Sequence, residues 1–193
     1  GFARNPELVL NFYNQRRRQL FDVKPNQGHL ALAELEKYYR VQIVTQNVDD
    51  LHERAGSSRV LHLHGELLKV RSTGPKQTIQ SWYSDLNSSH TCPDGYPLRP
   101  HIVWFGEDVP LFPEAVKIVS NAQLIIVVGT SLQVYPAASL LNHIHYSANL
   151  IIIDPKPNIT PGSIANIQVI CDRAATGIPT LVESLKRRAI WYS

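Results

Sequence analysis

The chain has 193 residues, of which 44% are hydrophobic and 18% are charged, and its formal net charge is +3. This composition predicts one compact domain, or one large lobe with a small insertion, and excludes a disordered chain. The charge is too small for a nucleic-acid-binding surface, and no apolar run is long enough to span a membrane. The only cysteines, Cys92 and Cys171, argue against a disulfide framework and favour a cytoplasmic location.

A helix is expected to begin near Asn5, which suits the N-cap, with Pro6 at the first helical position. At about 100° per residue, the apolar side chains of this helix are predicted to form one stripe: Leu8, Val9, Phe12, Tyr13 and Leu20. Arg16 falls within this stripe, whereas Arg17 and Arg18 are expected to point elsewhere.

The place of Arg16 on an apolar face raises the question of its partner. A guanidinium there needs an anion, because its burial without a partner is costly. Tyr13 lies three residues earlier on the same side, and a phenol beside a forked guanidinium suits a carboxylate guest. The helix alone favours the alternative, in which Arg16 pairs with an internal acid or extends to water.

Apolar, β-branched segments along the chain are predicted strands: 41–47, 60–65, 101–106, 124–131, 149–155 and 167–172. Helical patterns lie between most of them, as in HLALAELEKYY, PEAVKIVSNA, AASLLNHIHYSA and TLVESLKRR. Near-continuous apolar strands that alternate with helices predict an α/β fold with a parallel sheet covered on both faces. Ligands bind at the carboxyl ends of such strands, and here these ends carry polar residues or glycine.

The first of these strand ends carries the segment TQNVDD. If the extended chain continues, Asn47 and Asp49 lie on one side, where an amide and a carboxylate can bind a carboxamide. The alternative is that Asp49 or Asp50 caps the helix expected at DLHERAG, and capping by Asp50 would leave Asp49 free.

The next strand end carries two histidines in the segment LHLHG. His62 and His64 are expected on one side of the strand, but a catalytic zinc needs a third protein ligand. A histidine just before a glycine can instead act as a general base, and in isolation a packed or capping histidine is the simpler reading. Further on, Gly129, Thr130 and Ser131 predict a strand-to-helix turn whose amides meet phosphate or ribose, a weak signal alone.

The segment 67–98 interrupts the alternation of strands and helices, because it is polar and rich in Ser, Thr, Gly and Pro. Its short β-like pieces, LLKVRS and TIQSWY, predict a small inserted module. The rest of the chain then divides into a helical segment, 1–40, and a Rossmann-like lobe made of 41–66 and 99–193.

Four ordered motifs, TQNVDDLHERAG, HLHGEL, RPHIVWFGE and VVGTSLQVYPA, resemble those of the sirtuins, and the similarity continues to RAATGIPTLVESL. The resemblance implies a Rossmann-like lobe and a smaller lobe that bind NAD and an acyl-lysine peptide between them. It implies that His64 activates a ribose hydroxyl, and that the products are lysine, nicotinamide and O-acyl-ADP-ribose. The helix FYNQRRRQL resembles a bacterial branch in which a tyrosine and an arginine, here Tyr13 and Arg16, recognise an acyl carboxylate.

The resemblance also implies binding roles for particular residues. Asn47 and Asp49 would hold the nicotinamide carboxamide, and Gln46 would contact its ribose. The phosphate and adenosine side would be lined by Gly129, Thr130, Ser131 and Asp154, with Ala174 near the adenine. The peptide would be clasped as an added strand by the backbone of Val103, Trp104, Phe105, Gly106, Val134 and Tyr135. His62 is expected to pack or to orient its neighbours.

The chain departs from the sirtuin pattern in its cysteines. Most sirtuins hold a structural zinc with four cysteines in the small module, whereas KVRST has none and HTCPDG has only Cys92. One thiolate cannot form that site, so we expect a zinc-free module with Trp82 and Tyr83 as its small core. At position 154 the family usually has Asn, and Asp154 can still accept hydrogen bonds from ribose hydroxyls.

A second departure concerns the start of the chain. The family's glycine-rich phosphate loop and first Rossmann strand precede the Tyr/Arg helix, and no GAGxS-type motif occurs before Asn5. The chain, which opens on Gly1, is therefore expected to be either a fragment of a longer enzyme or a natural remnant. A missing strand would expose a sheet edge and favour self-association.

The leading hypothesis is an NAD-dependent protein lysine deacylase that removes succinyl, malonyl and acetyl groups from acylated proteins. The alternative is a catalytically impaired module that binds acyl-lysine or ADP-ribose. Transfer of ADP-ribose onto proteins would use the same NAD site, and a metal hydrolase built on His62 and His64 is the least favoured reading. No nucleic acid or membrane partner is expected.

Overall fold

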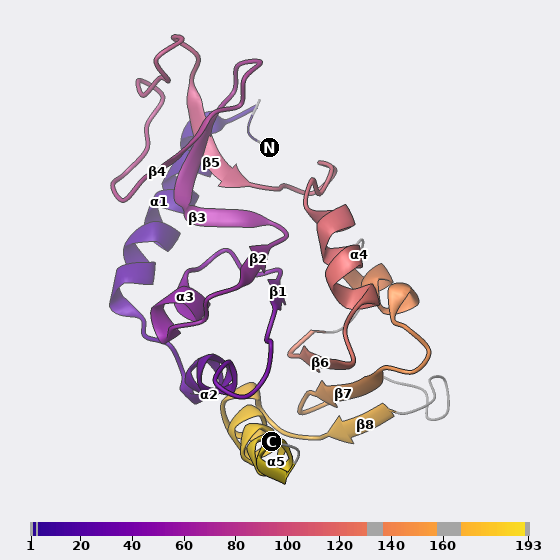
Figure 1. Ribbon diagram of the computed structural model, residues 1–193. Helices are drawn as coiled ribbons and strands as arrows, with labels where there is room; N and C mark the ends of the chain where they lie inside the picture. The colour runs from indigo at the N-terminus through magenta and orange to yellow at the C-terminus, as the bar shows by residue number, and fades with distance from the viewer. Residues whose placement is uncertain (1, 3, 131–136, 158–166, 192–193) are drawn as a thin grey trace.

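The computed structural model of the chain describes residues 2, 4–130, 137–157 and 167–191 (Figure 1). Its α-helices are α1 (Pro6–Asp22), α2 (Gln27–Leu35), α3 (Leu51–Ala55), α4 (Phe112–Ser120) and α5 (Ala174–Trp191). A 3-10 helix, η1 (Ala137–His143), stands where the pattern AASLLNHIHYSA predicts an ordinary helix. The strands are β1 (Ile43–Thr45), β2 (Val60–His62), β3 (Gly65–Ser72), β4 (Ile79–Ser81), β5 (Leu98–Ile102), β6 (Leu124–Val128), β7 (Asn149–Ile153) and β8 (Ile167–Ile170).

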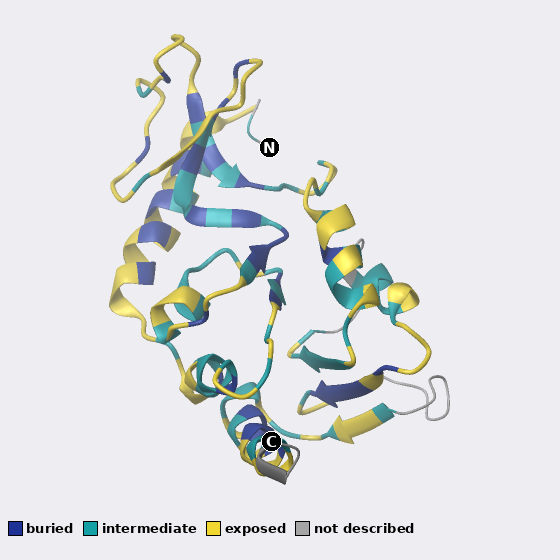
Figure 2. Cartoon of the chain, in the orientation of Figure 1, coloured by how far each residue is buried: buried dark blue, intermediate teal, exposed yellow. Residues whose placement is uncertain are grey.

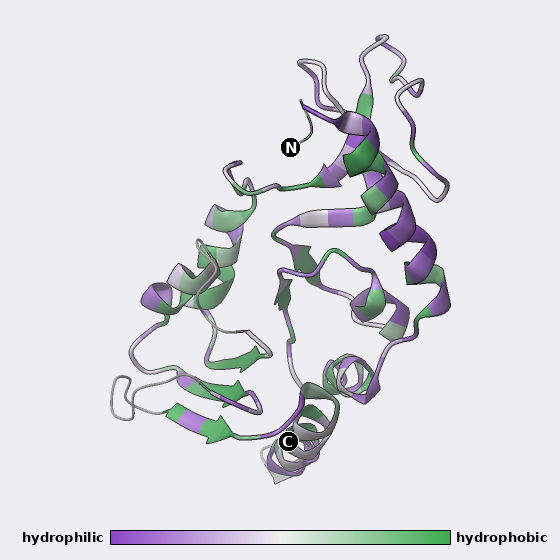
Figure 3. Ribbon diagram, turned by 180° about the vertical axis from the view of Figure 1, so that it is seen from behind, coloured by the Kyte–Doolittle hydropathy of each residue, from purple (hydrophilic) through white to green (hydrophobic). Residues whose placement is uncertain are grey.

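Two of the sheets are parallel, as the apolar runs predict. β1 pairs with β2, and β7 lies between β6 and β8 in a separate sheet. The inner strand β7 is largely buried, whereas β6 is half-exposed along its whole length (Figure 2). Figure 3 shows that β6, β7 and β8 are mostly hydrophobic, in contrast to the largely hydrophilic α1. Among the described strands, none pairs with the outer edge of β6.

The third sheet is antiparallel, with β3 between β4 and β5. The prediction that 101–106 forms a strand of the parallel sheet is therefore wrong, because β5 ends at Ile102 and pairs with β3 instead. This antiparallel sheet begins at Gly65 and ends at Ile102, so it extends beyond 67–98 on both sides.

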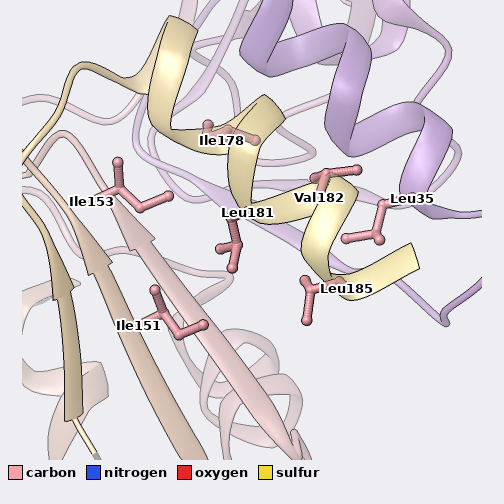
Figure 4. Packing of buried hydrophobic residues seen from close by; sticks show 7 residues of the cluster. All are labelled: Leu35, Ile151, Ile153, Ile178, Leu181, Val182 and Leu185. Carbon is pink, nitrogen blue, oxygen red and sulfur yellow. The ribbon is translucent and has the colours of Figure 1, made fainter. Parts of the chain in front are cut away.

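The largest hydrophobic cluster joins α5 and α2 to one face of β7 (Figure 4). It consists of Leu35, Ile151, Ile153, Ile178, Leu181, Val182 and Leu185. Burial of these aliphatic side chains is the main force that holds the second parallel sheet to the helices. Helix α5 begins well before the predicted pattern TLVESLKRR and contains Pro179.

Helix α1 begins as the sequence predicts, because the backbone amide of Leu8 donates to Asn5 Oδ1 over 3.1 Å. Its buried face differs from the predicted stripe. Leu8 and Phe12 are 64% and 54% exposed, whereas Arg17 is only 1% exposed. The buried residues are Leu10, Asn14, Arg17 and Leu20.

The reason for this burial is hydrogen bonding to the backbone of the small module. Arg17 donates to the carbonyls of Leu67 and Ser84 over 3.1 and 3.2 Å, and Asn14 both donates to and accepts from the backbone of Leu86. Irregular chain needs such partners, because a buried backbone group without one is costly. The apolar pattern of the helix cannot show this requirement.

The core of the small module also differs from the prediction. Its buried cluster consists of Leu10, Val70, Leu86, Cys92 and Leu98. Trp82 packs against this cluster in part, but Tyr83 is 63% exposed and is not a core residue. None of the helices in the described ranges has the length and apolar character needed to cross a membrane.

Candidate active site

A cavity of about 450 Å³ lies between α1, the segment that follows β1, and β3. This volume is typical of a site for a small molecule. Its lining residues are Arg16, Gln19, Leu20, Val23, Gln46, Asn47, Val48, Asp49, Leu51 and Leu67. The fold thus brings four predicted site residues together around one space: Arg16, Gln46, Asn47 and Asp49.

The polar end of β1 is held in place by short local hydrogen bonds. Thr45 Oγ1 accepts from the backbone amide of Asn47 over 3.0 Å, and Asp49 Oδ1 accepts from the amide of Leu51 over 3.1 Å. Asp50 occupies the N-cap of α3 but makes no side-chain cap hydrogen bond. Of the two capping alternatives, the structure therefore shows the one in which the Asp49 side chain bonds at the start of α3, and not capping by Asp50. A carboxylate that accepts one bond still has further acceptor sites.

Arg16 lies one helical turn from Tyr13 and is largely exposed to the cavity and solvent. Within the described part of the chain, its guanidinium forms no hydrogen bond or ion pair, so no internal acid neutralises it. The neighbouring Arg18 differs, because it pairs with Asp85 over 2.6 Å at the surface. Arg16 is thus a cation on a cavity wall that is open to an external anion.

Tyr13 is held by a tryptophan far along the chain. Trp104 Nε1 donates to Tyr13 Oη over 2.8 Å, and the two ring centroids are 6.2 Å apart. Burial raises the pKa of Tyr13, which keeps the phenol protonated at neutral pH. A phenol that accepts from one donor still has its own proton to donate.

Trp104 is fixed in turn by a charged pair. Arg99 lies 3.4 Å from the centroid of its ring, a cation–π contact. Glu107 accepts from Arg99 Nη1 over 2.6 Å and from the backbone amide of Trp104 over 2.9 Å. Analysis of the sequence missed Arg99 and Glu107, and the only local signal is an acidic residue three positions after Trp104.

His64 lies in a turn and not, as expected, in a strand, because β2 ends at His62. Its carbonyl accepts from the amide of Val103 over 2.9 Å, which places it beside the end of β5. The next residue must be glycine, because Gly65 has φ +84 and a Cβ there would collide with the carbonyl of His101. Within the described ranges, the His64 ring makes no hydrogen bond, so both nitrogens are open to a ligand.

His62 has a different environment from His64. It is 7% exposed, with Nε2 at 2.7 Å from Glu53 Oε1 and Nδ1 at 3.3 Å from the carbonyl of Asn47. This burial agrees with the expectation that His62 packs, whereas a role in orienting its neighbours stays a prediction. In the described residues, no group of three or more His, Cys, Asp or Glu side chains is placed to hold a metal ion.

The residues predicted for the adenosine side follow the strands of the second parallel sheet. Gly129, with φ +56, directly follows β6. Asp154 directly follows β7, and its Oδ1 accepts from the amide of Lys156 over 2.7 Å. Thr130 follows Gly129, and Ala174 is the first residue of α5. The other predicted residues, Ser131, Val134 and Tyr135, lie outside the described residues.

The predicted peptide-binding segment is a bend rather than an extended strand. The amide of Val103 is bonded to His64, and the carbonyl of Trp104 accepts from the amide of Glu107. Phe105 is fully exposed at this bend, and Gly106 has φ +87. An added peptide strand on this segment stays a prediction.

Comparison with known proteins identifies the class to which this fold and site belong. The model of the Sir2 family matches residues 1–136. An NAD-dependent protein deacylase of Helicobacter pylori is 56% identical over 185 residues, which cover 96% of this chain and 80% of that protein. An enzyme of the same name from Bacteroides thetaiotaomicron is 47% identical over 191 residues, which cover 96% of this chain and 81% of that protein.

The fold is also similar to the crystal structure of a Sir2 homologue in complex with NAD, with a TM-score of 0.87 and 38% sequence identity. The matched region covers 97% of this chain and 75% of the homologue's chain. Fold, site and relatives together define an NAD-dependent protein deacylase of α/β, Rossmann-like architecture. The chain belongs to the Sir2 family. The predicted family, fold class, NAD dependence and enzyme class are confirmed.

Proposed function

We propose that this deacylase removes succinyl and malonyl groups from lysine side chains of proteins, as well as acetyl groups. The observation that supports the acidic acyl groups is the unpaired guanidinium of Arg16 on the wall of the cavity. An unpaired cation beside a site for a small molecule favours an anionic guest, and its planar fork matches a carboxylate.

The phenol of Tyr13 supplies a second contact to the same carboxylate. Tyr13 lies three residues before Arg16, so both side chains lie on adjoining parts of one helix face. Because Trp104 Nε1 already donates to Tyr13 Oη, the hydroxyl proton is free to be donated to the acyl carboxylate. An acetyl group lacks the carboxylate and loses both contacts.

The cavity suits the nicotinamide end of NAD. Asn47 and Asp49 offer the amide and carboxylate that a carboxamide needs as partners, and Gln46 lies beside them for the ribose. The side chains of Leu20, Val23, Leu51 and Leu67 supply apolar walls for an aromatic ring. When bound, NAD would supply an electrophilic ribose carbon, to which the acyl oxygen can bond as the bond from that carbon to nicotinamide breaks.

His64 is the proposed general base. Its ring is half-buried, is open to a ligand and is held beside the end of β5 by its own carbonyl. An imidazole in this position can take the proton of a ribose hydroxyl as that oxygen attacks the acyl carbon. Gly129, Thr130 and Asp154, with Ala174, would contact the phosphate and adenosine side, since ligands bind at the carboxyl ends of parallel strands.

The proposed partners are acylated proteins, and the proposed location is the cytoplasm. The direct test is mass spectrometry of the chain with NAD and a succinyl-lysine peptide, beside a His64→Ala variant. We expect O-succinyl-ADP-ribose from the chain and none from the variant. Peptide binding without this product would favour a binding module, and ADP-ribose attached to protein would favour transferase activity.

The carboxylate role of Arg16 has its own test. We expect Arg16→Met to lower kcat/KM for a succinyl peptide by about tenfold or more, through loss of a charge-assisted hydrogen bond, and to leave deacetylation nearly unchanged. The matched control is Arg18→Met on the same helix, whose exposed pair with Asp85 contributes little. Equal losses on both peptides in Arg16→Met would contradict the carboxylate role.

A further inference from the structure

His62 is a buried histidine with an oxygen atom at each ring nitrogen. Nδ1 lies 3.3 Å from the carbonyl of Asn47, and Nε2 lies 2.7 Å from Glu53 Oε1 on α3. A carbonyl and a carboxylate only accept hydrogen bonds, whereas a neutral imidazole has one N–H. Only the doubly protonated, charged ring can donate to both oxygens at once.

The surroundings of His62 support this charged form. Burial opposes it, but the hydrogen bond and the negative charge of Glu53 outweigh burial and raise the pKa of His62 above its usual value. Glu66 on β3 adds a further favourable charge. Two further histidines lie nearby, His52 on α3 and His29 on α2. Burial lowers the pKa of both, which favours their neutral form and so limits charge repulsion with His62.

The contacts of His62 act on the segment that lines the cavity. The backbone of Asn47 is held on both sides, by Thr45 Oγ1 at its amide and by His62 at its carbonyl. Asp49 is tied to the amide of Leu51 at the start of α3, the helix that carries Glu53. The charged pair therefore joins β2, α3 and the cavity segment in one network.

We propose that His62 and Glu53 are positioning residues for NAD, which hold Asn47 and Asp49 in the geometry that receives the nicotinamide carboxamide. This inference rests on the proposed roles of Asn47 and Asp49. Loss of the His62 proton removes one of its two donors, so the carbonyl of Asn47 loses its partner and the segment loosens. NAD affinity then falls as the pH rises through the pKa of His62, and the affinity is highest below it.

The test uses Glu53→Gln and His62→Gln, with His145→Gln at an exposed loop as the matched control. At pH 6, below the usual pKa of histidine, we expect the Kd for NAD, measured by calorimetry, to rise about tenfold in both variants, the value of one charge-assisted hydrogen bond. We expect kcat and the KM for the peptide to change little. Hydrogen exchange at the amides of Asn47 and Leu51 should become faster in both variants and stay unchanged in the control.

Titration of the ring by NMR supplies a readout that a purely structural role would not move. In the native chain, the midpoint of the fall in NAD affinity should coincide with the pKa of the His62 ring. Glu53→Gln should move both midpoints to lower pH together. Because Glu53 is 42% exposed, this variant keeps the test valid even if His62→Gln fails to fold.

An NAD affinity in Glu53→Gln that equals the native value at every pH would overturn the inference. A second outcome would also overturn it: Glu53→Gln weakens NAD binding and peptide binding by the same factor and lowers the melting temperature. That combination indicates a role in folding only. Asn47→Ala separates this inference from the proposed function. If Asn47→Ala leaves NAD binding intact, the proposed roles of the cavity segment fail; if it weakens NAD while Glu53→Gln does not, only the inference fails.

Discussion

At the scale of single residues, Tyr13 shows how one distant contact sets the direction of a proton. The indole N–H of Trp104 occupies one acceptor site of the phenol, and Arg99 and Glu107 hold the indole in place. The hydroxyl must then direct its own proton elsewhere, and the acyl carboxylate beside Arg16 is the proposed acceptor. Under the proposed function, Trp104 would thereby contribute to acyl selectivity without carrying charge.

Replacement of Trp104 by phenylalanine tests this contribution. Trp104→Phe keeps an aromatic ring for Arg99 but removes the N–H, so the hydroxyl of Tyr13 is free to rotate. We expect the KM for a succinyl peptide to rise about fivefold and the KM for an acetyl peptide to stay within twofold, because one neutral hydrogen bond is lost. Steady-state kinetics with both peptides decide this, and an equal rise in both would instead indicate a general defect in peptide binding.

At the scale of elements, α1 joins the small module to the cavity through two different faces. One face buries Asn14 and Arg17 against the backbone of the module. The other places Arg16 on the cavity wall, with Tyr13 three residues before it. Adjacent arginines on one helix thus have opposite tasks, since one holds the fold together and the other is left free for a ligand. Buried polar side chains such as Asn14 and Arg17 are tolerated when most of their hydrogen-bonding groups have partners.

The same substitution at three successive positions separates these tasks. Arg17→Met should lower the free energy of unfolding by about 3 kcal/mol, because it leaves buried carbonyl oxygens without a donor. Arg16→Met and Arg18→Met should each lower it by less than about 1 kcal/mol, since both side chains are exposed. Urea denaturation measures all three, and an Arg17→Met variant as stable as the other two would show that burial of this guanidinium contributes nothing net.

At the scale of the whole molecule, the two parallel sheets are not joined by hydrogen bonds among the described strands. Helices α2 and α5 connect them through contacts with one another and through the cluster on β7 (Figures 1 and 4). The edge strand β6 is apolar and half-exposed throughout. An apolar strand with an unpaired edge is a template for pairing with another chain.

We therefore expect the chain to self-associate through β6 as its concentration rises. Ile125→Lys should reduce this association, because a charge on an edge strand disfavours pairing. Ile125 alternates with the residues of β6 that pack against the cluster of α2, α5 and β7, so it lies on the opposite face of the strand. The matched control is Gln15→Lys on the exposed side of α1. Sedimentation equilibrium over a range of concentrations measures the effect, and a monomer at every concentration would refute the expectation.

The sequence by itself determined the α/β class, the family and the set of candidate site residues. Apolar runs and helical periods report on residues that are neighbours along the chain, and ordered motifs identify the Sir2 family with no reference to packing. The cavity is lined by four of these candidates, Arg16, Gln46, Asn47 and Asp49, whose roles stay predictions. These conclusions need only local patterns and their order.

Only the tertiary structure decided which polar side chains are buried and what they contact. Arg17 meets Leu67 across 50 positions of sequence, and Trp104 meets Tyr13 across 91. Likewise, the antiparallel pairing of β5 and the oxygen atoms at both nitrogens of His62 depend on strands and helices that come together only in the fold. The physical reason is that a buried polar group is stabilised by its partner, and distant partners leave no periodic signal in the sequence.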